Sequence, residues 1–248
     1  MIPSLGDHLL FALIAVAYPL CFTLDWFRRL RHELEARGAS ARLRFYRRSI
    51  IELWLLAVVI LVWWLWLGRT VTTVGLGLPG GWVFWIGITI VLAIATALGH
   101  QISVVRASAE ARAQVRKQFR GVPALMVPRD NRERRLWVGL SLTAGFCEEF
   151  IYRGFLLWYL MTWLPDAAAV LVSAIVFGGA HLYIGWGTGV LRATVMGVAL
   201  GAVYLLTGTL WLPISLHAVV DVTSGLTGSA ALDNGEPAMH QRPAEGEA

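Results

Sequence analysis

The sequence predicts an all-α fold, a polytopic membrane helical bundle with about seven transmembrane helices, from three observations. Hydrophobic residues make up 57% of the 248 residues and charged residues only 15%. The mean hydropathy of +0.62 lies far outside the balance of a soluble domain. Apolar runs close to the bilayer-spanning length of about 20 residues recur along the chain, and most charged residues gather between them.

Seven segments are apolar enough to be read as spans. The first follows "MIPSLGDHLL", which lacks a basic region and a small-residue cleavage site, so we interpret it as a retained helix and not as a signal peptide. Tryptophans near the ends of the second and third suit interfacial anchors. The expected spans are 9–27, 50–67, 82–104, 136–160, 168–183, 190–206 and 210–228.

The positive charge is concentrated in two loops. Eight of the 21 Lys and Arg residues lie in 28–48 and nine in 105–135, whereas the loop between the second and third spans holds only Arg69. The positive-inside rule then places both basic loops in the cytoplasm, the N-terminus outside and, after seven spans, the C-terminus inside. Because these arginines flank membrane spans, topology and anionic headgroups explain the net charge of +5, and no nucleic-acid partner is expected.

Composition divides the chain into three parts. Residues 1–135 form an N-terminal set of membrane anchor helices with two basic cytoplasmic loops, and 136–228 form the core that holds most intramembrane polar residues. Within the first part, 105–120 is predicted to be a basic amphipathic helix on the cytoplasmic face that ends at "GVPALMVPRDN". The small, polar stretch 229–248 is predicted to be a disordered tail.

The core opens with two adjacent glutamates and an arginine in "CEEFIYRGFL". An ionisable group at the centre of a spanning helix costs about 2.5–3.5 kcal/mol on insertion scales. Glu149 and Arg153 are four residues apart, so they share a helix face and can pair. Glu148 points about 100° away, so it needs a partner from another helix or a proton.

Two later helices offer such groups. His181 ends "FGGAH", and His217 and Asp221 share a helix face in "HAVVD". Each group alone has an ordinary structural explanation: a satisfied buried histidine, a buried ion pair, or an aspartate that orients a histidine. Together, six ionisable residues at membrane depth indicate function.

The motifs EExxxR (148–153), FxxxH (177–181) and HxxxD (217–221) occur in this order on successive predicted spans. The sequence therefore resembles the CPBP family, also called Abi, of CAAX-type prenyl-protein endopeptidases and bacteriocin-processing or immunity proteins. The resemblance covers about 136–228. It implies an integral protein of the bacterial plasma (inner) membrane that acts on protein or peptide substrates, as an intramembrane (metallo)endopeptidase of membrane-associated or CAAX-like proteins.

The resemblance also implies a role for each residue. Glu148 is expected to be the general base that activates a water, with His181 helping to hold that water and His217 stabilising the oxyanion. Glu149 and Arg153 are expected to shape the site and balance its charge. Many members carry Asn where this chain has Asp221; because an ionised Asp cannot donate to an oxyanion, we expect Asp221 to fix the tautomer of His217.

Three alternatives stay open at this point. A divalent metal such as zinc has possible ligands in His181, His217 and Glu148, but there is no HExxH motif, and we favour a metal-free mechanism. A non-proteolytic immunity or scaffold protein of the same fold is the alternative function, although the motif residues are intact. A proton-coupled transporter is disfavoured, because no inverted repeat or pair of broken half-helices is visible.

Overall fold

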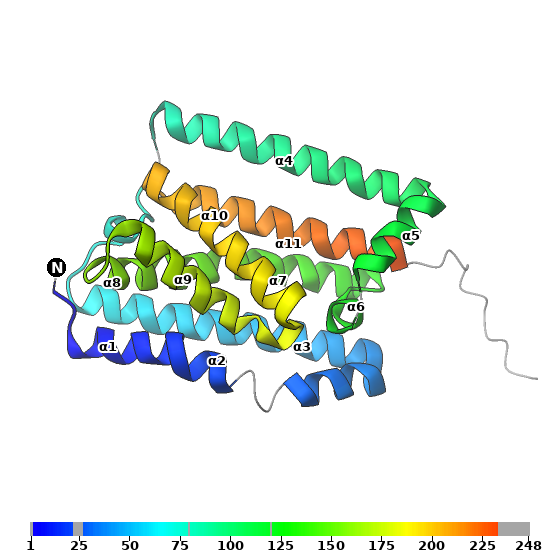
Figure 1. Ribbon diagram of the computed structural model, residues 1–248, viewed down its shortest axis with the longest axis horizontal. Coiled ribbons are helices and arrows are strands. Elements are labelled where there is room, and N and C mark those ends of the chain that lie inside the picture. Colours follow the sequence, from blue (N-terminus) through cyan, green and yellow to red (C-terminus); the bar gives the residue numbers. More distant parts are fainter. Residues whose placement is uncertain (1, 22–26, 79, 120, 233–248) are drawn as a thin grey trace, which may run out of the picture.

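The computed structural model describes residues 2–21, 27–78, 80–119 and 121–232. Every regular element in these ranges is a helix, so the predicted all-α class is confirmed there. The long helices run side by side along one direction, with α4 at one edge of the bundle and α1 at the opposite edge, as Figure 1 shows.

The first half of the chain contributes the outer helices. Ser4 caps α1 and forms a reciprocal capping box with Asp7. A φ of +47° at Gly38 breaks the long helix α3 into two arms, a conformation that glycine adopts without a Cβ clash. The elements are α1 Leu5–Ala12, η1 Leu13–Ala17, α2 Tyr18–Cys21, α3 Phe27–Trp66, η3 Val71–Val74 and α4 Gly81–Ala107.

The predicted basic amphipathic helix is shorter than 105–120. It is α5, Ala109–Gln118, whose Ser108 cap accepts a hydrogen bond from the backbone of Ala111. Val115 packs with Ala230 and Ala231 of the last helix, and Arg116 donates a hydrogen bond to the carbonyl oxygen of Ala231. As expected, α5 ends before "GVPALM", where Gly121 has a φ of +65° and α6, Val122–Met126, begins.

The second half of the chain contains the inner helices. The first three elements form one uninterrupted helical stretch whose middle part is π-helical. Two short helical segments then connect the next two long helices. The elements are α7 Asn131–Glu149, η4 Phe150–Leu156, α8 Leu157–Met161, α9 Asp166–Ala180, η5 Leu182–Ile184, η6 Trp186–Leu191, α10 Arg192–Thr207 and α11 Trp211–Leu232. In Figure 1, α7 and α11 run through the middle of the bundle.

Small residues let α9 and α10 pack closely. A Cβ atom on Gly197 would lie 2.9 Å from Cβ of Ala174, and one on Gly201 would lie 2.9 Å from Cγ1 of Val170. The GxxxG spacing of Gly197 and Gly201 therefore lets the two helix backbones approach closely.

Three helices are long and apolar enough to cross a membrane: Arg29–Trp66, Gly81–Ala107 and Gly189–Thr207. They correspond to the predicted spans 50–67, 82–104 and 190–206. The other four predicted spans overlap helices that do not meet this criterion over the described residues, so the number seven stays a prediction. Residues 22–26 of the first predicted span lie outside the described residues.

The predicted tail is wrong at its start. Ser229, Ala230 and Ala231 belong to α11 and are buried. Arg116 of α5 donates a hydrogen bond to the carbonyl oxygen of Ala231, and Arg134 donates one to the hydroxyl of Ser229. The rest of the predicted tail, 233–248, lies outside the described residues.

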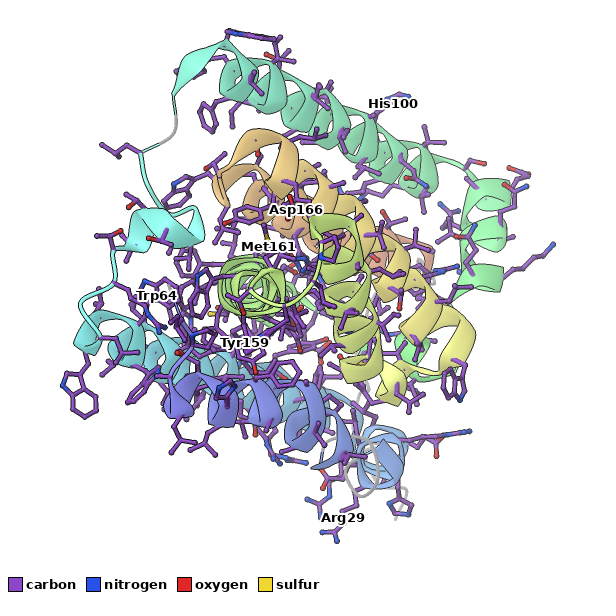
Figure 2. All side chains as sticks on the ribbon, turned by 60° about the vertical axis from the view of Figure 1, so that its left-hand side comes forward. Arg29, Trp64, His100, Tyr159, Met161 and Asp166 are labelled. Carbon is purple, nitrogen blue, oxygen red and sulfur yellow. The ribbon has the colours of Figure 1, made fainter. Side chains whose placement is uncertain are left out.

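A buried ion pair ties α1 to the end of α3. Arg69 donates from Nη1 and Nη2 to the two carboxylate oxygens of Asp7 at 2.8 and 2.7 Å, and its guanidinium lies between the rings of Trp64 and Trp158. Tyr159 on α8 lies beside α1 in the same region (Figure 2). Burial raises the pKa of Asp7, but hydrogen bonds from Arg69 and Ser4 outweigh it and hold the pKa at about 2.

Candidate active site

The predicted pair of Glu149 and Arg153 is confirmed. Nη1 of Arg153 donates to Oε1 of Glu149 at 2.7 Å, and both side chains are almost fully buried. Glu149 ends α7, and Arg153 lies in the π-helical segment η4. Single π-helical turns inside α-helices are frequent at functional sites. The sequence spacing therefore predicted the contact, although not the wider helical turn in which it occurs.

His217 on α11 joins this pair from across the bundle. Its Nδ1 atom lies 2.7 Å from the same Oε1 atom of Glu149. Because that carboxylate is also bound to Arg153, it accepts, and Nδ1 of His217 is the donor. One oxygen thus connects α7, η4 and α11.

Asp221 lies beside the other nitrogen of the His217 ring. Its Oδ2 atom lies 3.5 Å from Nε2 of His217, on the side of the ring away from Glu149. Nδ1 of His217 donates the hydrogen bond that orients the imidazole, and it donates to Glu149, the carboxylate that reaches the buried edge of the ring. The Asp221 side chain is 39% exposed, so it borders the site instead of lying behind it.

Glu148 faces His217 of another helix but does not form a hydrogen bond with it. Its Oε2 atom lies 3.8 Å from Nε2 of His217, which is longer than a hydrogen bond. This atom is buried and makes no hydrogen bond within the described residues, and the same holds for Oε2 of Glu149 and Nη2 of Arg153. Glu148 therefore has an accepting oxygen that faces His217 and is free to bind a further polar group.

A glycine allows α7 and α11 to come this close. A Cβ atom on Gly145, one turn before Glu149, would lie 2.9 Å from Cβ of Ala218 and 3.0 Å from the carbonyl oxygen of Ile214. The absence of a side chain at this position brings the backbones together where Glu149 meets His217.

His181 closes α9. Its Nδ1 atom lies 2.9 Å from the carbonyl oxygen of Phe177. A carbonyl can only accept, so Nδ1 carries the hydrogen and, in the neutral ring, Nε2 carries the lone pair. The ring of Phe177 lies between the two histidines, 4.6 Å from the His181 ring and 6.0 Å from that of His217.

Sequence reasoning missed three contributors to this arrangement. Phe177, which also stacks under the guanidinium of Arg153 at 4.5 Å, was visible only as the first letter of FxxxH. Trp137 donates from Nε1 to the carbonyl oxygen of Asp221 at 3.0 Å, and a tryptophan in an apolar helix carries no signal for such a contact. Nothing in the sequence marked Gly145 as the position where two helices come close together.

The residues proposed as metal ligands do not form a complete ligand set. Glu148 and His217 approach each other, but among the described residues no group of three or more His, Cys, Asp or Glu side chains is placed to hold a metal ion. Nδ1 of His217 and of His181 are engaged in hydrogen bonds, which leaves only Nε2 of each ring for another ligand.

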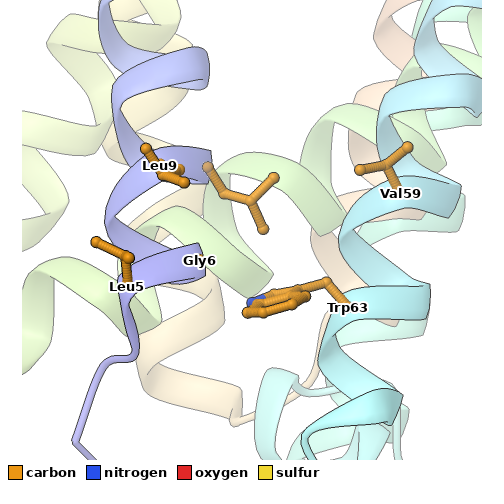
Figure 3. Close-up of a pocket in the computed structure, with 6 residues that line it drawn as sticks. Leu5, Gly6, Leu9, Val59 and Trp63 are labelled. Atoms are coloured by element: carbon orange, nitrogen blue, oxygen red, sulfur yellow. The ribbon is translucent and has the colours of Figure 1, made fainter.

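One hollow of the described structure lies away from the candidate residues. It has a volume of about 420 Å³ and is formed between α1 and α3, as Figure 3 shows. Leu5, Leu9, Val59 and Trp63 line it, and none of the six candidate residues does. Its lining is apolar and offers no groups for hydrolysis.

Comparison with known proteins gives one match. Residues 132–223 match the family described as type II CAAX prenyl endopeptidase Rce1-like. This confirms the predicted resemblance, and the matched segment contains all six candidate residues. The match covers less than half of the chain. Neither the curated proteins nor the solved structures include a match to this sequence.

Proposed function

We propose that this chain, whose residues 132–223 match the Rce1-like family of type II CAAX prenyl endopeptidases, hydrolyses peptide bonds of membrane-associated or CAAX-like proteins with a water that Glu148 activates. The family indicates a protease, and the apolar helices indicate an integral membrane protein. The observation that carries the finer proposal is the free Oε2 atom of Glu148, which faces Nε2 of His217 at 3.8 Å.

Glu148 is the general base in this mechanism. A water bound at Oε2 transfers a proton to the carboxylate while its oxygen attacks the carbonyl carbon of the substrate, and the same proton then passes to the leaving amine as the C–N bond breaks. The neutral Nδ1–H form of His181 has a lone pair at Nε2 that can accept the second hydrogen of that water. Both roles use atoms that the contacts described above leave available.

His217 stabilises the oxyanion. Its Nδ1–H is committed to Glu149, so the remaining edge of the ring, Nε2, is the one that meets the substrate. Donation from Nε2 requires the doubly protonated ring, because each imidazole nitrogen holds one hydrogen. A donor fixed in place before reaction stabilises developing charge without reorganisation.

Glu149 and Arg153 hold this donor in place. Their pairing fixes Oε1 of Glu149 at the end of α7, and that oxygen fixes the imidazole. Asp221 supplies a second carboxylate beside Nε2, where it contacts the entering substrate or water.

The proposed orientation keeps the N-terminus outside and the C-terminus in the cytoplasm of a bacterium. Its support is that the basic first arm of α3, α5 and the start of α7 gather at one end of the bundle in Figure 1. Exposed cations there, such as Arg47, Lys117 and Arg132, suit anionic lipid headgroups.

The decisive experiment uses purified full-length protein in lipid nanodiscs and a library of peptides with and without prenylated C-terminal cysteines. Wild type should cleave, and Glu148→Gln should not, with an unchanged melting temperature. Glu52→Gln, which removes a carboxylate outside the site, serves as the control and should cleave normally.

Metal content is quantified in the same preparations. Cleavage should survive EDTA if glutamate alone activates the water, and inhibition that a divalent metal reverses would refute the metal-free mechanism. Cleavage by Glu148→Gln at the wild-type rate would refute the role of Glu148. Failure of well-folded wild type to cleave any library member would favour the non-proteolytic alternative.

A further inference from the structure

The side chain of Phe177 lies at the centre of the candidate site and carries no reactive group. It is only 2% exposed. Its ring lies 4.5 Å from Cζ of Arg153, 4.6 Å from the ring of His181 and 6.0 Å from the ring of His217. No other aromatic residue among the described contacts touches all three.

The geometry of these contacts suits the charge distribution of an aromatic ring. The guanidinium of Arg153 lies over the ring of Phe177, whose electron-rich face attracts a cation. The ring of His217 meets it at 85°, the edge-to-face arrangement that aromatic pairs prefer. Phe177 therefore packs between the residue that anchors Glu149 and the residue that Glu149 orients.

The backbone of Phe177 acts on the third group. At the end of α9, the backbone N–H of His181 bonds the carbonyl of Gly178 and not that of Phe177. The Phe177 carbonyl is one of the last carbonyls of the helix, which lack their usual partners, and the Nδ1–H group of His181 binds it at 2.9 Å. The same residue thus sets the tautomer of His181 and packs against its ring.

We propose that Phe177 is a positioning residue that holds the imidazoles of His181 and His217 and the guanidinium of Arg153 in the arrangement that hydrolysis needs. This inference rests on the proposed function, since the arrangement matters for peptide hydrolysis only if the chain is a protease. It explains why a phenylalanine stands four residues before the histidine: this spacing places both the carbonyl and the ring of residue 177 beside His181.

The test compares Phe177→Leu with Phe155→Leu. Phe155 is an equally buried phenylalanine on η4, and its ring packs near that of Trp158, outside the candidate site. Each variant replaces a buried phenylalanine with leucine and so loses the same volume and one aromatic ring. A general loss of packing therefore lowers the stability of both variants alike. Phe177→Tyr, which keeps the ring, is the second variant in case Phe177→Leu does not fold.

Two readouts separate positioning from stability. The first is the ¹⁵N NMR spectrum of the imidazoles in histidine-labelled protein in nanodiscs, with signals assigned by His181→Gln and His217→Gln. Wild type should show His181 protonated at Nδ1 and not at Nε2. Phe177→Leu keeps the backbone carbonyl but loses the ring that packs the imidazole against it, so this single signal should broaden or split, whereas Phe155→Leu and Phe177→Tyr should retain it.

The second readout is the kinetics of peptide cleavage. Because a displacement of about 1 Å can lower a rate about a hundredfold, Phe177→Leu should lower kcat by about that factor with a much smaller change in KM. Phe155→Leu should stay within about threefold of wild type. A folded Phe177→Leu protein with wild-type imidazole signals would overturn the inference, and so would a wild-type kcat.

The two proposals fail in different ways. If wild type does not cleave peptides, the proposed function fails, but the imidazole spectrum still decides whether Phe177 holds the histidines. If wild type cleaves and Phe177→Leu behaves like Phe155→Leu in both readouts, only the inference about Phe177 fails.

Discussion

Glu149 binds Nδ1 of His217 and Nη1 of Arg153 through a single oxygen, at 2.7 Å in both cases. His217 comes from α11, whereas Arg153 lies one turn further along the same continuous helical stretch, in η4, and the carboxylate is fully buried. A buried carboxylate with two charge-assisted hydrogen bonds is held in one position. The motif residues therefore act as a connected unit, and removing any one of them affects the others.

Arg153→Ala should strongly destabilise the fold. The substitution leaves Glu149 buried with only the imidazole as a partner, and breaking a buried pair from one side costs about 3–5 kcal/mol. The control is Arg31→Ala, which removes the arginine of an exposed pair with the same four-residue spacing and should cost about 0–1 kcal/mol. Unfolding in detergent measures both, and equal losses would contradict a buried ion pair at Arg153.

Glu149→Gln should impair cleavage more than Asp221→Asn. Glu149 orients His217 through Nδ1, whereas Asp221 lies 3.5 Å from Nε2 and is partly exposed. Loss of a residue that orients a catalytic group typically costs 10–100-fold, so about 100-fold is expected for Glu149→Gln and less than about tenfold for Asp221→Asn. Rates of peptide cleavage by the two variants give the comparison, and the reverse order would restore the orienting role to Asp221.

Gly197→Ala should destabilise the packing of α9 on α10. The new Cβ atom would lie 2.9 Å from Cβ of Ala174 and 3.3 Å from Nη2 of Arg153, and overpacking of this kind costs about 1–3 kcal/mol. Gly99→Ala is the matched control, because a Cβ atom there meets no atom within 4 Å. It should be neutral or slightly stabilising, since alanine favours helix over glycine. Melting temperatures of the two variants test the difference.

The Asp7–Arg69 pair should make stability depend on pH at the acidic end. The pKa of Asp7 is about 2, below its ordinary value of 3.8, so the folded state favours the ionised carboxylate. That contribution, about 2 kcal/mol, is complete above pH 4 and is lost as the pH falls toward 2. Unfolding measured between pH 2 and pH 5 should show this loss in wild type, whereas Asp7→Asn should lack this component of the slope.

Local spacing was sufficient to predict part of the site. The four-residue separation of Glu149 and Arg153 is a property of any helix, and the structure confirms the pair. The same spacing places Asp221 beside Nε2 of His217, as a shared helix face predicts. Spacing within one helix could not reveal that Glu149, 68 positions away, binds the other nitrogen of that ring.

The sequence by itself determined the all-α class, the apolar helices and the residues that carry charge into them, because composition and helical periodicity are local properties of the chain. Three motifs in a fixed order also predicted the resemblance to the family whose model matches residues 132–223. Only the tertiary structure decided which carboxylate binds which nitrogen and that Phe177 packs between Arg153 and the histidines. Those contacts depend on the distance between helices, which small residues such as Gly145 set where two backbones meet, and no spacing within one helix contains that distance.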